Sequence, residues 1–294
     1  MSYWASKQAH QFPHFGWYIQ KLGADNRIHF DNFDVCKDIS KTDGSRMLIK
    51  FGNEFGHPLK APPFQHPNTC PHDNWYHWDN PELPQFLWPL GHNPSGAKDW
   101  VRWVKGGLLT QGSYSDDVPT HVKRINKLLR ETSGQLIYTW QDIVQIQKPQ
   151  HDLRKVALIC PVTAPNFVHY YATTQQDWIN KVTKVLERQG YTWEVRHKPG
   201  RGARVGNQLI DQLSGGKYGI TVSQHSVAAM ESAIAGISPV VTGPHPTGML
   251  GTPWTEFEYG HVRPISKKDV ENQCLRLLAN IRHKKELFTG AWNA

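Results

Sequence analysis

Ser223, His225, Ser226 and Glu231 are the side chains whose types and spacing most clearly indicate chemistry. They lie in the stretch Gly219–Gly243, where an apolar run leads into a Ser-Gln-His-Ser turn, a helical pattern and a second apolar run. A turn at a helix N-terminus offers backbone N–H groups and hydroxyls, which together bind phosphate. The stretch therefore predicts a phosphate site, and the alternative is that Ser223 or Ser226 is an ordinary helix N-cap.

A second loop adds positive charge beside this turn. In the segment VRHKPGRGAR, Arg196, Lys198, Arg201 and Arg204 follow the end of a predicted strand, among glycines and a proline. Cations on a turn that approaches a ligand closely suit a diphosphate, whereas the alternative is a solvated basic loop. Both loops are expected at the same edge of the predicted sheet, so the two observations support each other.

The second half of the sequence alternates between strand and helix patterns, and this alternation must position the two loops. Short apolar runs at Lys155–Cys160, at Thr192–Arg196 and on either side of the Ser-Gln-His-Ser turn predict strands. Helical spacing separates them, and a last helix is expected from about Asp269 to Lys285. The pattern is typical of an α/β fold with a doubly wound parallel sheet. The Gly- and Pro-rich segment Thr242–Trp254 is expected either to close over a ligand or to form a surface connection.

The first half is less regular. The segments RMLIKF and QLIYTW predict strands, and THVKRINKLLRETSG predicts a helix that ends at Gly134. Nine of the 20 prolines lie between Pro58 and Pro94, so we expect a long loop there. The interpretation is an irregular, loop-rich α/β domain over residues 1–150 and a regular α/β domain over residues 151–294.

Charge and composition restrict the class of protein. The 294 residues carry a net charge of +8, which indicates an anionic partner. Residues 151–294 contribute 17 Lys and Arg against 11 Asp and Glu, so most of the excess lies in the half that holds the turn. No apolar run is long enough for a stable membrane insertion, the N-terminus does not resemble a signal peptide, and the four cysteines are widely separated. We therefore expect a cytoplasmic protein with reduced thiols.

The strand, the segment SQHSVAAMESAIAGISPVV and the Gly/Pro loop together resemble the donor-binding half of GT-B glycosyltransferases, above all the capsular-polysaccharide type. The basic loop is similar to their Arg-x-x-Pro-x-Arg segment. Nucleotide-sugar 2-epimerases share this architecture. Ser223 stands where some retaining members carry a second glutamate, and GISPVV is one residue longer than the family pattern.

The resemblance implies two Rossmann-like domains that face a cleft, with acceptor binding by residues 1–150 and nucleotide-sugar binding by residues 151–294. It implies that Glu231 binds hydroxyls of the donor. The side chains implied to hold or neutralise the diphosphate are Ser223, His225, Ser226, Arg196, Lys198 and Arg201. Helix dipoles and cations stabilise the leaving nucleotide in such transfers, so neither a metal nor a cofactor is expected.

An inverting transfer needs a general base near the acceptor hydroxyl. Asp116 and Asp117 precede the helix of the first half and are the first candidates, with helix capping as the alternative. His57 is a further candidate. The segment His66–Asp79 contains histidines and Cys70, but their irregular spacing is weak support for zinc.

The acceptor is the most open part of the prediction. Eight of the 12 tryptophans precede residue 150, and aromatic side chains stack on extruded bases, which favours 5-hydroxymethylpyrimidine in DNA, as in a phage-type DNA glycosyltransferase. A polysaccharide or lipid-linked glycan is the alternative within the same class. A non-catalytic nucleic-acid-binding protein is the alternative of another class. The sequence does not indicate an oligomeric state.

Overall fold

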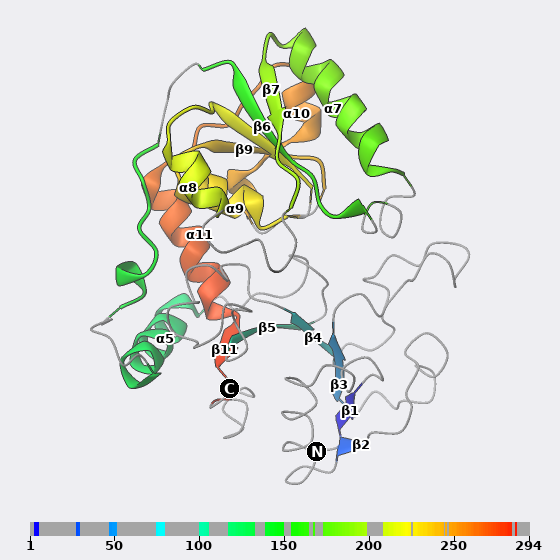
Figure 1. Ribbon diagram of the computed structural model, residues 1–294. Helices are drawn as coiled ribbons and strands as arrows, with labels where there is room; N and C mark the ends of the chain where they lie inside the picture. Colours follow the sequence, from blue (N-terminus) through cyan, green and yellow to red (C-terminus); the bar gives the residue numbers. More distant parts are fainter. Residues whose placement is uncertain are drawn as a thin grey trace. The chain divides into compact units, whose positions relative to one another are not determined.

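The structure is a computed structural model, and two compact units make it up: Met1–Gly134 with Leu278–Ala294, and Gln135–Leu277 (Figure 1). It describes residues 3–5, 28–29, 47–51, 75–79, 100–105, 117–132, 139–149, 154–164, 167, 173–198, 208–224, 226–243, 245, 247–283 and 286. The assignment of acceptor and donor binding to residues 1–150 and 151–294 stays a prediction.

A five-stranded parallel sheet forms the centre of the second unit. Its strands are β6 (Val156–Cys160), β7 (Thr192–Val195), β8 (Ile220–Ser223), β9 (Ser238–Val241) and β10 (Thr252–Pro253). Their spatial order is β10-β9-β8-β6-β7. The predicted α/β class with a parallel sheet is therefore confirmed.

Helices cover both faces of this sheet. They are α7 (Gln175–Arg188), α8 (Leu209–Ser214), α9 (Ala228–Ile234) and α10 (Trp254–Glu258), and the helix α11 (Lys267–Ala279) follows them in the chain. Strand side chains alternate, so Ala157 and Ile159 of β6 pack in one core cluster with α7 and α10, whereas Leu158 and Cys160 pack in another with α8 and α9. This two-sided packing is the doubly wound arrangement that the alternation of patterns predicts.

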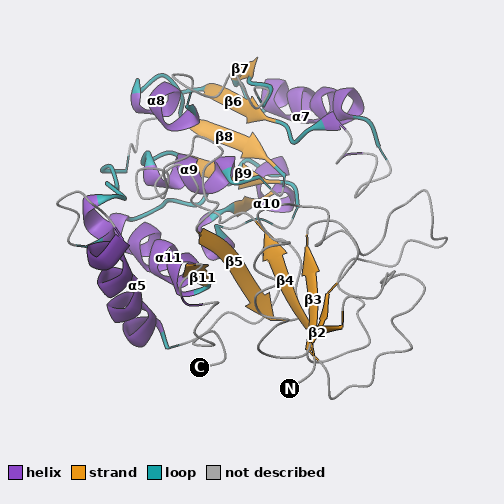
Figure 2. Ribbon diagram, turned by 60° about the horizontal axis from the view of Figure 1, so that its bottom comes forward, coloured by secondary structure: helices purple, strands orange, loops and turns teal. Residues whose placement is uncertain are grey.

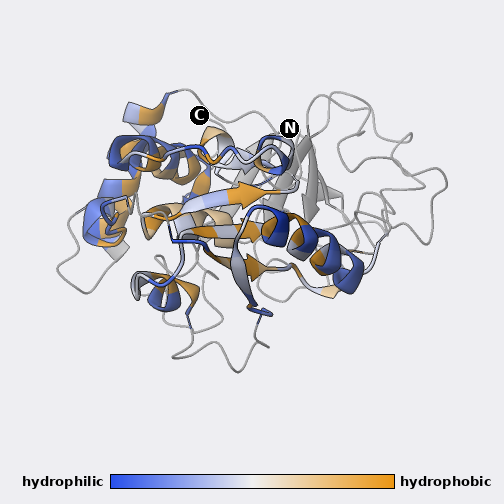
Figure 3. Cartoon of the chain, turned by 90° about the horizontal axis from the view of Figure 1, so that it is seen from above, coloured by the Kyte–Doolittle hydropathy of each residue, from blue (hydrophilic) through white to orange (hydrophobic). Residues whose placement is uncertain are grey.

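The sequence of α7 explains why this helix forms and packs on the sheet. Its buried residues recur with helical spacing, and Thr174 caps its N-terminus by accepting a hydrogen bond from the Asp177 N–H at 3.0 Å. Gly190 follows the helix at a φ of 77°, a conformation that glycine adopts without strain. In Figure 3 the helices beside the sheet carry both hydrophilic and hydrophobic residues around their surface. The helix therefore buries one stripe on the sheet and leaves the other in water.

A six-stranded mixed sheet forms the first unit, in the order β11-β5-β4-β3-β1-β2 (Figure 2). The strands are β1 (Tyr3–Ala5), β2 (Ile28–His29), β3 (Met47–Phe51), β4 (Trp75–Asp79), β5 (Trp100–Lys105) and β11 (Ile281–His283). The predicted strand RMLIKF is confirmed as β3. The expectation of a loop throughout Pro58–Pro94 is wrong at β4, where the aromatic run WYHWD pairs with β3 and β5.

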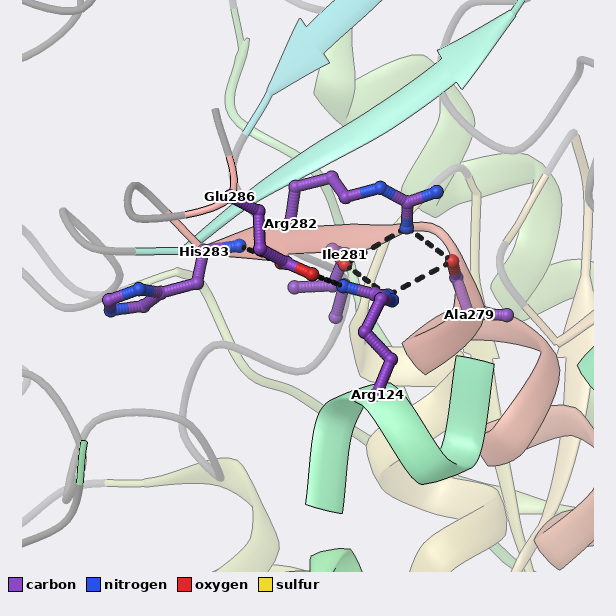
Figure 4. Close-up of polar contacts among 6 residues, drawn as sticks. All are labelled: Arg124, Ala279, Ile281, Arg282, His283 and Glu286. Atoms are coloured by element: carbon purple, nitrogen blue, oxygen red, sulfur yellow. Dashed lines mark hydrogen bonds and ion pairs between the residues drawn. The ribbon is translucent and has the colours of Figure 1, made fainter. Parts of the chain in front are cut away.

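Two segments that are far apart in the sequence meet in this unit (Figure 4). The helix α5 (Val118–Thr132), which confirms the predicted helix, places Arg124 against the strand β11. Arg124 donates to the Ile281 carbonyl at 2.8 Å and pairs with Glu286 at 2.5 Å, and Glu286 also accepts from the His283 N–H at 2.8 Å. The guanidinium of Arg282 donates to the Ala279 carbonyl at 2.6 Å. These hydrogen bonds and the ion pair connect the segment after α11 to α5.

Two expectations about elements need correction. The last helix does not reach Lys285, because α11 ends at Ala279 and the chain continues as β11, which pairs antiparallel with β5. Trp140, the last residue of the predicted strand QLIYTW, lies in the 3-10 helix η3 (Trp140–Asp142); residues 135–138 lie outside the described residues. Within the described part of the chain, no helix is long and apolar enough to span a membrane.

Candidate functional site

The carboxyl edge of the strands is where open parallel sheets bind their ligands. The strand order puts β6 between β7 and β8, so the chain leaves β6 in one direction to form β7 and crosses back to form β8. At such a reversal the connections after neighbouring strands diverge, and a crevice opens between them. The two strand ends that border it, Cys160 and Ser223, are paired in register.

Residues from three adjacent strand ends meet at this reversal. Arg196 follows β7, and its N–H donates to the Ile159 carbonyl of β6 at 2.9 Å. Glu231 lies in the first turn of α9, the helix that follows β8. Arg196 and Lys198 both act electrostatically on Glu231, and Arg196 and Glu231 both act on Cys160. Arg196 and Lys198 therefore lie within electrostatic range of Glu231, and these three predicted donor-site residues belong to the same edge of the sheet.

Two opposing effects act on the pKa of Glu231. The side chain is partly buried on α9, and this burial raises its pKa to about 7, against the opposing influence of Arg196 and Lys198. The Cys160 thiol at the end of β6 is buried, and its pKa is raised to about 12, so it stays neutral and unreactive. The edge therefore presents two cations within electrostatic range of a carboxyl group whose pKa is raised.

The Ser-Gln-His-Ser turn supplies polar atoms of two kinds. Ser226 acts locally, because its hydroxyl accepts a hydrogen bond from the Ala228 N–H at 3.2 Å at the start of α9. The Ser223 hydroxyl and the Gln224 Oε1 atom are buried and have no hydrogen-bond partner among the described residues. A buried acceptor without a partner is costly, so such atoms are frequent at ligand sites. His225 lies outside the described residues.

The loop after β9 borders the same edge. The Thr242 N–H donates to the Ser223 carbonyl at 3.0 Å, and the Thr242 hydroxyl accepts from the Trp178 indole at 3.0 Å. Further along, Nδ1 of His245 is hydrogen bonded to the Thr247 hydroxyl, and burial lowers the pKa of His245 to about 4. The imidazole is therefore neutral at physiological pH. These contacts give the loop a defined shape beside β8.

Two polar residues of this edge were not singled out by sequence reasoning. Gln224 is inside the quoted turn, and its burial depends on tertiary packing that no sequence pattern shows. His245 lies between two prolines in the Gly/Pro-rich loop. A titratable side chain in such a loop was the sequence signal that could have pointed to it. Arg201 of the basic loop lies outside the described residues.

The candidate bases belong to the first unit. Asp117 precedes α5 and accepts a hydrogen bond from the Thr120 N–H at 3.3 Å, so it caps the helix. Hydrogen bonds from Thr120 hold the pKa of the exposed Asp117 below its usual value. A role as general base stays a prediction for Asp117, and Asp116 and His57 lie outside the described residues.

Among the described residues, no group of three His, Cys, Asp or Glu side chains is arranged to hold a metal ion. His66, Cys70 and His72 lie outside that part, so the zinc alternative for His66–Asp79 stays untested.

The chain as a whole is similar in fold to a sugar transferase. It matches Thermosulfurimonas dismutans KpsC, beta Kdo 2,7 transferase, with a TM-score of 0.52 and 11% identity over 100% of this chain and 99% of that chain. It also matches Thermosulfurimonas dismutans KpsC, beta Kdo 2,4 transferase, with a TM-score of 0.47 and 14% identity over 96% and 91% of the two chains. The sequence matches no protein-family model and no curated protein. At such low identity, the agreement with the first structure concerns the fold alone.

Proposed function

We propose that the protein is a glycosyltransferase that moves a sugar from a nucleotide-activated donor to a hydroxyl group of a saccharide. The observation that carries the proposal is the meeting of Arg196, Lys198 and Glu231 at the strand-order reversal of the five-stranded sheet. The fold supports the same class, because the chain is similar along its whole length to an enzyme named as a beta Kdo 2,7 transferase.

Different residues of the carboxyl edge bind different parts of the donor. Arg196 and Lys198 neutralise the phosphate of the leaving nucleotide, which is the charge that grows as the glycosidic bond breaks. Glu231 and the Gln224 Oε1 atom accept hydrogen bonds, and a sugar or ribose is rich in hydroxyl donors. The loop with His245 borders the turn and limits the size of the bound group. This division of roles requires no metal.

A saccharide is the better-supported acceptor. The first matching structure, with a TM-score of 0.52, is named as a beta Kdo 2,7 transferase. Its name describes the transfer of a sugar, Kdo. The preference for DNA in the sequence analysis depended on tryptophan content and net charge, and no contact of the described residues adds to it. We therefore choose the glycan alternative and treat DNA as an outcome of the test.

The test is a transfer assay with a panel of nucleotide sugars, each offered oligosaccharide acceptors and, separately, duplex DNA that contains 5-hydroxymethylcytosine. The expected result is a saccharide of increased mass together with nucleotide release. Glu231→Ala should lower kcat/KM by at least about tenfold, equivalent to about 1.4 kcal/mol. Glu187→Ala, which changes an exposed carboxylate on α7, is the matched control and should leave the rate unchanged.

Three results would contradict the proposal in different ways. Sugar incorporation into DNA alone would replace the acceptor and keep the reaction. Salt-dependent DNA binding without nucleotide release from any donor would favour a non-catalytic nucleic-acid-binding protein. An unchanged rate in Glu231→Ala, with transfer otherwise present, would remove the carboxyl edge from the active site.

A further inference from the structure

Thr242 follows β9 directly, at the carboxyl edge of the five-stranded sheet. Its backbone N–H donates to the Ser223 carbonyl at 3.0 Å, so the pairing of β8 with β9 continues for one further residue. Its hydroxyl accepts a hydrogen bond from the Trp178 indole at 3.0 Å. Both the backbone and the side chain of Thr242 are therefore held in place by neighbouring elements.

Trp178 is a fixed donor near the start of α7. It is 6% exposed, and its ring packs against Phe167 at a centroid distance of 5.3 Å. The helix α7 follows β6, and β8 lies between β6 and β9 in the sheet, so the bond to Thr242 spans the carboxyl end of β8. An indole has one N–H and no acceptor, so the hydrogen of the Thr242 hydroxyl points away from Trp178. Thr242 is only half-buried, which leaves this O–H accessible.

Three neighbouring polar groups at the ends of β8 and β9 are not fully hydrogen bonded within the described part of the chain. No described group accepts a hydrogen bond from the Thr242 hydroxyl. The Ser223 hydroxyl and the Gln224 Oε1 atom have no partner there either, although the two residues are only 0% and 2% exposed. Leaving buried polar groups without partners is costly, so their concentration at one place indicates that a ligand binds them.

The chemistry of the three groups indicates the kind of ligand. The Thr242 hydroxyl donates, the Gln224 oxygen only accepts, and the Ser223 hydroxyl does either. An oxyanion offers acceptors only and would leave the Gln224 oxygen unpaired. An alcohol hydroxyl both donates and accepts, so a ring that carries several hydroxyl groups satisfies the whole set.

We propose that Thr242 binds a hydroxyl-bearing ring of the nucleotide-sugar donor, and that Trp178 is the positioning residue that directs the Thr242 O–H toward that ring. The inference rests on the proposed function, because it names a further residue of the same donor site. The ribose and the transferred sugar share this chemistry. A hydroxyl that is already held in one orientation loses less conformational entropy when it binds a ligand, which is what the Trp178 hydrogen bond contributes.

The experiment measures the affinity of the full-length protein by calorimetry for two sets of probes. One set is UDP, its 2′,3′-dideoxyribose counterpart and UDP-glucose, and the other is CMP, its 2′,3′-dideoxyribose counterpart and CMP-sialic acid. If the ribose is bound, Thr242→Val should weaken binding of the nucleotide and the nucleotide sugar by about tenfold and leave the dideoxy probe unchanged. If the transferred sugar is bound, only the affinity for the nucleotide sugar should fall.

Further variants separate hydrogen bonding from packing. Thr242→Ser keeps the hydroxyl and should bind within about twofold of the wild type, whereas Trp178→Phe keeps a buried ring without the N–H and should weaken binding by about threefold. Thr183→Val is the control for the loss of a buried threonine hydroxyl, because Thr183 donates to the Asn180 carbonyl within α7 at 3.1 Å. Trp193→Phe, on the exposed side of β7, is the control for the loss of an indole N–H.

The possible failures are distinguishable. Wild-type affinity of Thr242→Val and Trp178→Phe for every probe that the wild type binds would overturn the inference. An equal loss of affinity in Thr242→Ser and Thr242→Val would do the same, because the hydroxyl would then be irrelevant. If Glu231→Ala still weakened binding in either case, the donor site would stand without Thr242. No binding of any nucleotide or nucleotide sugar by the wild type would overturn both the inference and the proposed function.

Discussion

The carboxyl group of Glu231 is titratable and buried, so its ionisation affects the stability of the fold. Burial on α9 raises its pKa from 4.5 to about 7, so the folded state holds the proton more tightly than the unfolded chain does. Stability from this group is therefore fully present below about pH 4.5 and is lost as the pH rises through about 7. At alkaline pH the charged side chain destabilises the native state.

We expect Glu231→Gln to stabilise the protein at pH 8 because the amide carries no charge to bury. The gain relative to the wild type should be small at about pH 4.5 and should reach about 1 to 3 kcal/mol at about pH 8. Urea unfolding at both pH values measures it. An equal effect of the substitution at the two values would show that Glu231 is not held in a raised-pKa environment.

At the scale of elements, the loop between β9 and β10 depends on a close approach of backbone to side chain. Gly251 has an ordinary φ of −75°, so the backbone there tolerates other residues. A Cβ atom at this position would lie 2.5 Å from Cε1 of His245 and 2.9 Å from the Thr247 hydroxyl. The glycine is therefore required by the space that the His245 ring occupies.

Gly251→Ala should displace His245 and distort the loop beside the Ser-Gln-His-Ser turn. We expect weaker binding of the nucleotide donor, by roughly tenfold, with a loss of stability of about 1 to 3 kcal/mol. Gly215→Ala is the matched control, since its Cβ would meet only the Gln212 carbonyl at 3.5 Å. Calorimetry with the donor identified in the transfer assay, together with thermal unfolding, measures both effects. Equal behaviour of the two variants would show that the position of His245 is unimportant.

Elements with strong local patterns were predictable from the sequence, and those that depend on distant partners were not. The spacing of Trp178, Ile179, Val182 and Leu186 is helical, and α7 forms there. By contrast, the segment at β11 continues the helical spacing of α11, yet it forms a strand because β5 offers a pairing edge. For the site, the residue types at each strand end were visible, but the burial that shifts the pKa of Glu231 and leaves Gln224 Oε1 without a partner comes from tertiary packing.

At the scale of the whole molecule, the two compact units differ in how they use the chain. The second unit, Gln135–Leu277, is continuous in sequence, whereas the first combines Met1–Gly134 with Leu278–Ala294. Arg124 connects the two parts of the first unit in addition to the pairing of β11 with β5, since it binds the Ile281 carbonyl and the carboxylate of Glu286. Glu286 has a side-chain exposure of only 8%, so this ion pair is largely shielded from water.

Arg124→Ala should destabilise the first unit by about 2 to 4 kcal/mol, because it leaves a buried carboxylate without its cation. Lys127→Ala on the same helix is the control: Lys127 is exposed and 3.9 Å from Glu131, and its loss should cost less than about 0.5 kcal/mol. Hydrogen exchange followed by mass spectrometry should show faster exchange in α5, β5 and β11, with β6 and β8 unchanged. Faster exchange in β6 and β8 as well would show that the two units unfold together.

The place of β11 also has a consequence for biosynthesis. A ribosome releases the chain from the N-terminus onward, so every residue of Gln135–Leu277 emerges before Ile281–His283, the strand that pairs with β5. During translation the parallel sheet can thus assemble while β5 still exposes an unpaired edge and Arg124 still lacks Glu286. The half of the protein that is made first is then the last to be completed, and its open strand edge is where a nascent chain would need the protection of a chaperone.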